Sequence, residues 1–179
     1  MKGTPKVFGF GLAVSFLLGA GQARADGIEA TGDVLQYALP ATAMGLTLID
    51  KDWDGALRFT GAFAVQGLTV LALKSIVYET RPNGQGHQSF PSGHSAVAFA
   101  SAEFMRARYG WTCGVPAYAL AAFTAYSRVE SDHHYWHDVG AGAAIGIFSS
   151  MFFTYQGSTW SVSPSTDGKS FGLTFKRFW

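Results

Sequence analysis

The sequence predicts an all-α protein: a helical bundle of about five helices that we expect to be transmembrane, after an N-terminal signal peptide, with a short C-terminal β-hairpin. Two observations lead to this class. Of the 179 residues, 48% are hydrophobic and 14% are charged, against about 25% charged residues in ordinary soluble domains. Charged residues also enclose long stretches that carry no formal charge. The length suits one compact domain.

The N-terminal segment has the features of an export signal. Lysines precede an apolar run over residues 7–20, and Ala23-Arg24-Ala25 follows the small-x-small pattern that signal peptidase cleaves. We therefore interpret residues 1–25 as a signal peptide and residues 26–179 as the functional domain. The alternative is an uncleaved N-terminal anchor, because Arg24 stands inside the cleavage motif.

Five apolar segments follow and predict the helices. Glu103 and Arg106 interrupt the segment from Ser92 to about Arg108, and their i, i+3 spacing lets them pair on one face. A membrane-spanning helix needs about 20 mostly apolar residues, and several of these segments are shorter or carry polar residues. A soluble periplasmic helical bundle is therefore the alternative. The other four segments are bounded by charges: Asp33 to Asp50, Arg58 to Lys74, Arg108 to Arg128 and Asp138 to Asp167.

The distribution of basic residues predicts the orientation. If the helices cross in turn after signal removal, the connections 74–91 and 127–138 face the periplasm. This arrangement satisfies the positive-inside rule and predicts a multi-pass protein of the bacterial inner membrane whose active site faces the periplasm. The basic residues that then fall in cytoplasmic loops are Lys51, Arg106, Arg108, Lys169, Lys176 and Arg177.

The C-terminal segment has a different pattern. Within residues 158–179, apolar residues alternate with small or polar ones around Asp167-Gly168. Alternation around such a turn predicts a short β-hairpin, and a polar tail is the alternative.

Composition also excludes several classes of partner. A net charge of +1 gives no field that would attract nucleic acid. The single cysteine, Cys113, excludes an internal disulfide and a Cys-rich metal site. We expect no metal and no other cofactor, although a His-rich loop with His133, His134 and His137 raises zinc as a weaker alternative. Three histidines are extra to the motifs described below, and their role stays open: His87, His133 and His137.

Scarce charged residues gather in the two periplasmic connections. Lys74 ends an apolar helix and Arg81-Pro82 follows it. Pro91-Ser92-Gly93-His94 opens the next helix with a capping serine and free amides, an arrangement that binds anions. Arg128 ends a later helix, and His134 with Asp138 is spaced i, i+4, so that the carboxylate can orient the imidazole. Three cations, free amides and two imidazoles suit a tetrahedral oxyanion.

These motifs, in their order and spacing, resemble the three-part signature of the type 2 phosphatidic acid phosphatases (PAP2), within the acid phosphatase and vanadium haloperoxidase superfamily. Lys74 and Arg81-Pro82 form the first part, residues 91–94 the second, and Ser127-Arg128 with His134 and Asp138 the third. Every position of the signature is matched, and it spans about 65 residues.

The resemblance implies a metal-independent phosphatase. His134 would attack phosphorus to form a phosphohistidine, Asp138 would orient it, and His94 would protonate the leaving oxygen and then activate water. The implied substrate is a phosphorylated lipid in a membrane: undecaprenyl diphosphate, phosphatidylglycerol phosphate, phosphatidic acid or lipid A. The implied phosphate-binding groups are Lys74, Arg81, Ser92, Gly93 and Arg128.

Three other functions remain open from the sequence. A soluble, non-specific periplasmic acid phosphatase would share every catalytic residue. A vanadium haloperoxidase would use the same pocket for vanadate, but such enzymes are usually much longer. A non-catalytic phosphate-binding or lipid-binding membrane protein would keep the cations and have no use for the pair His134 and Asp138. The oligomeric state stays open.

Overall fold

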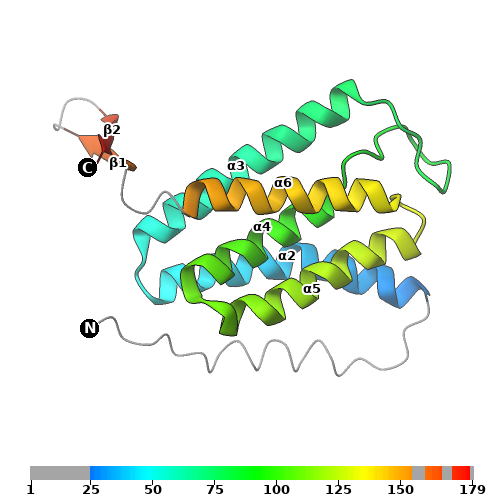
Figure 1. The fold of residues 1–179 in the computed structure, drawn as a ribbon, viewed down its shortest axis with the longest axis horizontal. Helices are drawn as coiled ribbons and strands as arrows, with labels where there is room; N and C mark the ends of the chain where they lie inside the picture. The colour runs from blue at the N-terminus through cyan, green and yellow to red at the C-terminus, as the bar shows by residue number, and fades with distance from the viewer. Residues whose placement is uncertain (1–24, 155–159, 167–170, 178–179) are drawn as a thin grey trace.

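Five α-helices form one bundle in the computed structural model, which describes residues 25–154, 160–166 and 171–177 (Figure 1). The predicted all-α fold with about five helices is confirmed. The predicted signal peptide lies outside the described residues, apart from Ala25. The helices are α2 (Ala25–Ile49), α3 (Trp53–Ile76), α4 (Gly93–Tyr109), α5 (Trp111–Glu130) and α6 (Trp136–Thr154).

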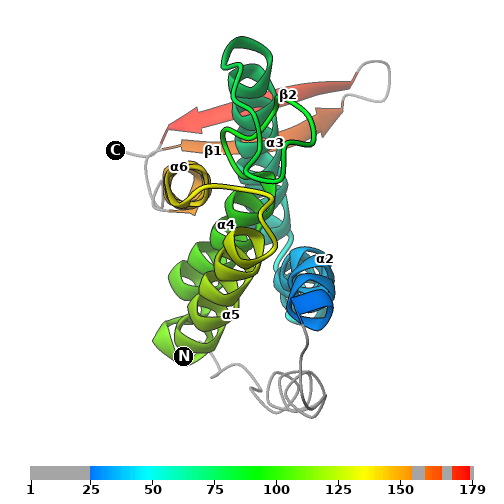
Figure 2. The same ribbon diagram turned by 90° about the vertical axis from the view of Figure 1, so that its right-hand side faces the viewer.

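Helix α4 is the centre of the bundle. It packs against each of the other four helices, most extensively against α6 and α5, and the end-on view shows it enclosed by them (Figure 2). Small side chains make this packing close, because they let neighbouring backbones approach. The wholly buried alanines of α4 are Ala96, Ala98, Ala100 and Ala102.

Two glycines of α6 set its contact with α4. A Cβ built on Gly142 would lie 2.3 Å from the carbonyl oxygen of Ser92, and one built on Gly146 would lie 2.2 Å from that of Ala96. Any side chain at these positions would therefore push the two helices apart. This contact fixes the start of α6 against the start of α4.

Local interactions agree with most of the predicted helices. The N-cap of α4 is Ser92, and the predicted pair on α4 is present, with Arg106 Nη2 2.6 Å from Glu103 Oε1. Tyr118 also donates to Glu103, from α5. Helix α2 differs from the expectation, because it begins at Ala25, well before the charged boundary at Asp33. Acidic residues near a helix N-terminus interact favourably with its dipole, so they extend the helix instead of ending it.

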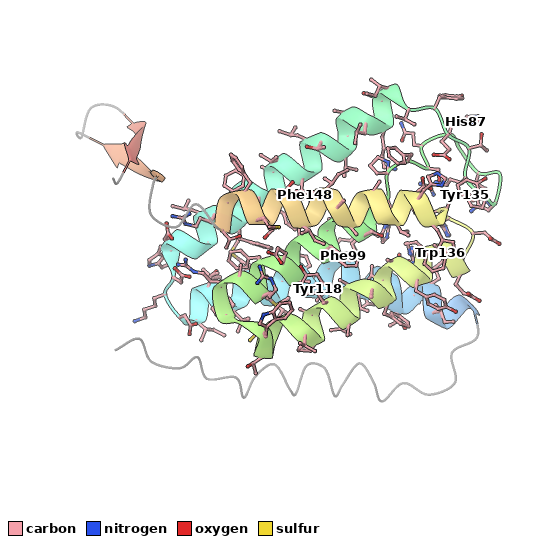
Figure 3. The ribbon with its side chains drawn as sticks, in the orientation of Figure 1. His87, Phe99, Tyr118, Tyr135, Trp136 and Phe148 are labelled. Carbon is pink, nitrogen blue, oxygen red and sulfur yellow. The ribbon has the colours of Figure 1, made fainter. Side chains whose placement is uncertain are left out.

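One end of the bundle collects the residues of the predicted site. The starts of α2, α4 and α6 and the ends of α3 and α5 meet there (Figure 1). The connections 77–92 and 131–135 lie at the same end and are joined by a hydrogen bond from Asn83 N to Asp132 O of 3.0 Å. His87 and Tyr135 mark this end in Figure 3.

Two strands follow the helices. In the structure β1 (Trp160–Thr166) pairs antiparallel with β2 (Phe171–Arg177), with Trp160 opposite Arg177 and Thr166 opposite Phe171. The turn expected at Asp167-Gly168 lies outside the described residues.

Candidate functional site

The connection from α3 to α4 is held by backbone hydrogen bonds and by Lys74. Glu79 exchanges backbone bonds with two residues later in the connection, donating to His87 O (3.2 Å) and accepting from Ser89 N (3.0 Å). Lys74 Nζ donates to the carbonyl oxygen of Gln88 at 2.6 Å. The connection therefore folds back on the end of α3 and places Arg81 beside it.

His134 and Asp138 form the predicted pair. His134 Nδ1 lies 3.5 Å from Asp138 Oδ2, and both side chains are buried, with 4% and 0% exposed. Nδ1 has no hydrogen-bond partner in the described part of the chain, so the pair is in contact without a well-formed hydrogen bond. Since Nδ1 faces the carboxylate, Nε2 is the nitrogen available for chemistry.

Asp138 is held firmly by other groups. Its Oδ2 accepts from Ser89 Oγ at 2.5 Å and from the backbone N–H of Tyr135 at 2.9 Å. Its backbone carbonyl accepts from Ser92 N at 3.0 Å. The carboxylate is thus fixed from the α3–α4 connection, and the start of α6 is tied to the start of α4.

The surroundings of His134 keep its imidazole neutral. Burial, which disfavours the charged form, together with the nearby cations Lys74 and Arg81 lowers the pKa of His134 to about 4, although Asp138 acts in the opposite direction. A neutral imidazole has a free lone pair near neutral pH. His134 is therefore in the protonation state that a nucleophile requires.

The N-terminus of α4 adds amide donors and a second imidazole. The N–H groups of Gly93 and His94 lie in the first turn, where no intrahelical acceptor exists. The Ser92 hydroxyl also makes a local contact. It is fully buried and accepts from Ser95 N (3.4 Å) and Ser95 Oγ (3.2 Å) as the helix cap.

Arg128 reaches the same end of the bundle from α5 and is almost fully buried. Its Nη1 donates to Asp33 Oδ1 at 2.7 Å and its Nη2 to the Glu29 carbonyl at 2.7 Å. His94 Nε2 also lies 3.0 Å from Asp33 Oδ1. The sequence interpretation took Asp33 only as the boundary of a helix. An ionisable residue inside an apolar helix is by itself a sign of a functional site. This sign would have identified Asp33 as a candidate site residue from the sequence.

The other histidines are dispersed. His137 Nε2 lies 2.8 Å from Glu79 Oε1 and 3.2 Å from Asp138 Oδ1, and His133 Nε2 lies 3.5 Å from Glu29 Oε1. Three of these residues, Glu79, His137 and Asp138, could together hold a metal ion, because their ligand atoms lie within 4.8 Å of one another. The trio of histidines considered from the sequence does not form such a group among the described residues.

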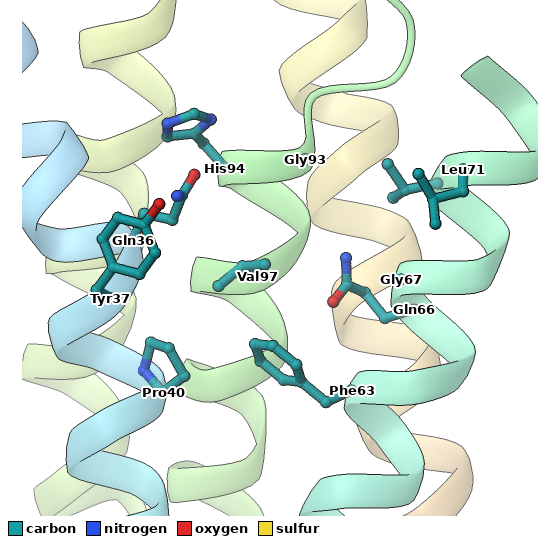
Figure 4. A pocket seen from close by; sticks show the side chains of 11 residues that line it. Gln36, Tyr37, Pro40, Phe63, Gln66, Gly67, Leu71, Gly93, His94 and Val97 are labelled. Atoms are coloured by element: carbon teal, nitrogen blue, oxygen red, sulfur yellow. The ribbon is translucent and has the colours of Figure 1, made fainter.

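An apolar pocket opens beside His94. It lies between α2, α3 and α4, has a volume of about 350 Å³, and begins at Gly93 and His94 (Figure 4). Val97 and Phe63 also line it, as does the buried Gln66, whose Oε1 has no hydrogen-bond partner within the described residues. The pocket contacts the His94 side of the site, and His134 does not line it.

The site can hold an oxyanion beside a neutral imidazole. Lys74 and Arg81 lie near His134. The backbone amides of Gly93 and His94 are free to donate. Arg128 Nη1 lies 3.5 Å from Nε2 of His94, the second imidazole. The predicted residues all carry a polar group at this end of the bundle, and the Ser92 hydroxyl there caps α4. A nucleophilic nitrogen next to cations and amide donors suits transfer of a phosphoryl group.

Comparisons with known proteins agree with this chemistry. A family model described as the PAP2 superfamily matches residues 55–161. The chain is 30% identical over 171 residues to the lipid A 4'-phosphatase of Helicobacter pylori, covering 85% of each chain. It is 41% identical over 103 residues to the lipid A 1-phosphatase of Porphyromonas gingivalis, covering 54% of this chain and 23% of that protein. The crystal structure of Aquifex aeolicus LpxE has a similar fold, with a TM-score of 0.63 and 21% identity over 73% of this chain and 87% of that one.

Proposed function

Because this chain belongs to the PAP2 superfamily and is a phosphatase, we propose that it hydrolyses lipid phosphates in a membrane, through a phosphohistidine and without a metal ion. The single observation that supports this most is the arrangement at one end of the bundle, where a buried neutral imidazole, cations and free amides meet the mouth of an apolar pocket.

The chemistry assigned to the site has two steps. His134 Nε2 attacks phosphorus, the bond from phosphorus to the leaving oxygen breaks, and His94 gives that oxygen a proton. Water then attacks the phosphohistidine, His94 takes the proton of that water, and the bond from phosphorus to nitrogen breaks to release phosphate. Asp138 orients His134, and the developing charge is stabilised by Lys74, Arg81, Arg128 and the amide of Gly93.

The pocket beside His94 suits an acyl chain. It extends from the phosphoryl site along apolar side chains of α2, α3 and α4. The outward face of α3 carries exposed leucines, Leu68 at 67% and Leu71 at 65%. Of the described helices, α3 is the one that is long and apolar enough to span a bilayer, with 22% of its apolar window buried. A lipid could thus enter from the bilayer with its phosphate at His134.

Tryptophans at the helix ends support a membrane position. Trp53 and Trp111 begin α3 and α5 at the end opposite the site, and Trp136 begins α6 at the site end; each is about two-thirds exposed. Tryptophan prefers the two interfaces of a bilayer. With the basic loops of the sequence inside, the site would face the periplasm of a bacterial inner membrane, and the protein would be multi-pass.

Lipid A phosphates are the first substrate to test, because the two curated relatives are named as lipid A phosphatases. The experiment measures phosphate release by the detergent-purified protein, with EDTA present. The substrates are lipid A, phosphatidylglycerol phosphate, phosphatidic acid, undecaprenyl diphosphate and p-nitrophenyl phosphate. We expect release from a lipid to exceed release from the soluble ester.

His134→Ala separates catalysis from binding. We expect this variant to lose turnover on every substrate and to retain binding of vanadate, a phosphate analogue. His87→Ala is the matched control, since His87 is exposed and bonds to Thr80. Substantial turnover by His134→Ala would refute the phosphohistidine step, and activity on the soluble ester alone would favour a non-specific acid phosphatase.

A further inference from the structure

A carboxylate from outside the three motifs reaches the proposed site. Asp33, on α2, accepts a hydrogen bond from Arg128 Nη1 at 2.7 Å and lies 3.0 Å from His94 Nε2. One oxygen, Oδ1, makes both contacts. Its two partners are a phosphate-binding residue and the proton donor of the proposed mechanism.

The chain is built to bring Asp33 to this point. A Cβ on the preceding residue, Gly32, would lie 1.9 Å from Ser127 Oγ and 3.0 Å from Arg128 Nη2. Only glycine therefore lets α2 approach α5 so closely. The Glu29 carbonyl, one turn earlier on α2, accepts from Arg128 Nη2 and fixes the same approach.

We propose that Asp33 is a positioning residue for proton transfer: it holds the imidazole of His94 by Nε2, so that Nδ1 is the nitrogen that protonates the leaving oxygen. This proposal rests on the proposed function. A carboxylate that accepts from one imidazole N–H fixes the tautomer and ring orientation and stabilises the imidazolium form. The site then contains two imidazole–carboxylate pairs, His134 in contact with Asp138 at 3.5 Å and His94 with Asp33 at 3.0 Å.

The charges around His94 explain why a carboxylate is needed there. The groups that face it are Arg128 on α5, Asp33 on α2 and His133 in the connection 131–135. Arg128 Nη1 lies 3.5 Å from His94 Nε2, so a protonated His94 would meet a buried guanidinium. Asp33 lies against both and offsets this repulsion. The proton moves from His94 Nδ1 to the leaving oxygen as the bond to phosphorus breaks.

The dependence of the rate on the leaving group tests this role. Benzyl phosphate releases an alkoxide that must be protonated, whereas p-nitrophenyl phosphate releases a stable phenolate that leaves without a proton. The parameter kcat/KM reports the steps up to the phosphohistidine. For Asp33→Asn we expect kcat/KM to fall about 100-fold on benzyl phosphate, in the range of a lost general acid, and to change little on p-nitrophenyl phosphate.

Three further variants and a control separate positioning from folding. His94→Ala should show the same leaving-group dependence, and adding Asp33→Asn to it should cost little more, because the two residues act as a unit. Asp33→Glu keeps the carboxylate and should recover part of the benzyl phosphate rate. Asp132→Asn, the same charge change on an exposed residue of the site end, is the control and should match wild type on both esters.

The contrary outcomes are distinct. An equal fall on both esters for Asp33→Asn would mean a structural role and would overturn the proposal. Unchanged kcat/KM on benzyl phosphate with tighter inhibition by inorganic phosphate would make Asp33 a competing anion, and would also overturn it. A wild-type protein that hydrolyses neither ester nor any lipid phosphate would instead refute the proposed function.

Discussion

The hydroxyl of Ser89 donates a 2.5 Å hydrogen bond to Oδ2 of Asp138, and both residues are fully buried. This bond joins the α3–α4 connection to the first turn of α6. The bond from Ser89 is shorter than the 3.5 Å contact between Asp138 and His134, so Ser89 holds the carboxylate more closely than His134 does. The orientation of His134, the proposed nucleophile, therefore depends on a serine that belongs to none of the three motifs.

Ser89→Ala should lower phosphatase activity without unfolding the protein. Removing a hydrogen bond to a buried charged group costs about 1.5–3 kcal/mol, and a fall of about tenfold in kcat/KM corresponds to 1.4 kcal/mol. Steady-state hydrolysis of p-nitrophenyl phosphate checks this. Ser75→Ala, an exposed serine on α3 that bonds only its own helix, is the control, and equal activity of the two variants would contradict the assigned role.

The acid limb of the pH profile should report His134. Its pKa is lowered to about 4 by burial and by the cations Lys74 and Arg81, and the reactive form is neutral, so kcat/KM should fall as the pH drops through that value. Lys74→Gln removes one cation, which raises the pKa and moves the limb to higher pH. Dividing kcat/KM of the variant by kcat/KM of the wild type, on one substrate and at each pH, cancels the effect of the ionisation of the substrate. A ratio that does not vary with pH would contradict this assignment.

Filling the pocket should affect lipids selectively. Gly67 lines the pocket, and a Cβ there would meet nothing within 4 Å, so Gly67→Leu starts a side chain in open space and adds bulk to the pocket. We expect KM to rise for long-chain lipid phosphates and to stay unchanged for p-nitrophenyl phosphate. Gly45→Leu is the matched control, because Gly45 is also unobstructed and lies outside the pocket. Equal effects of the two variants would exclude this pocket as the acyl-chain site.

The contact between α4 and α6 should tolerate no side chain at Gly146. A Cβ there would lie 2.2 Å from the Ala96 carbonyl and 2.8 Å from Ala100 N, and overpacking of this kind costs about 1–3 kcal/mol. Thermal unfolding in detergent should show a lower Tm for Gly146→Ala. Gly140→Ala on the same helix meets nothing within 4 Å and should unfold near the wild-type temperature.

The sequence predicted the helices and most of the site because both have strong local signals. Apolar segments between charges predicted α3, α5 and the first part of α6, and Pro91-Ser92-Gly93-His94 predicted the start of α4. The start of α2 was misplaced, since its acidic residues were interpreted as a boundary. The signal peptide lies outside the described residues and stays a prediction.

Contacts across the bundle could not be predicted, because they depend on packing between distant segments. Asp33 and Arg128 are joined only when Gly32 lets α2 approach α5. Glu79 and His137 belong to none of the predicted roles, and the structure pairs them. The Ser92 hydroxyl was expected at the phosphate; it caps α4 as an acceptor, and its contact with phosphate stays a prediction.

The enclosure of α4 has a consequence for membranes of different thickness. From Gly93 to Ala107 none of its residues is exposed, and its 17 residues rise about 26 Å at 1.5 Å each, less than the roughly 30 Å hydrocarbon core. A helix with so little accessible surface need not match that core. Hydrophobic mismatch would tilt the outer helices first, so the depth of His94 is set by protein packing, and a thinner or thicker bilayer should leave the chemistry unchanged.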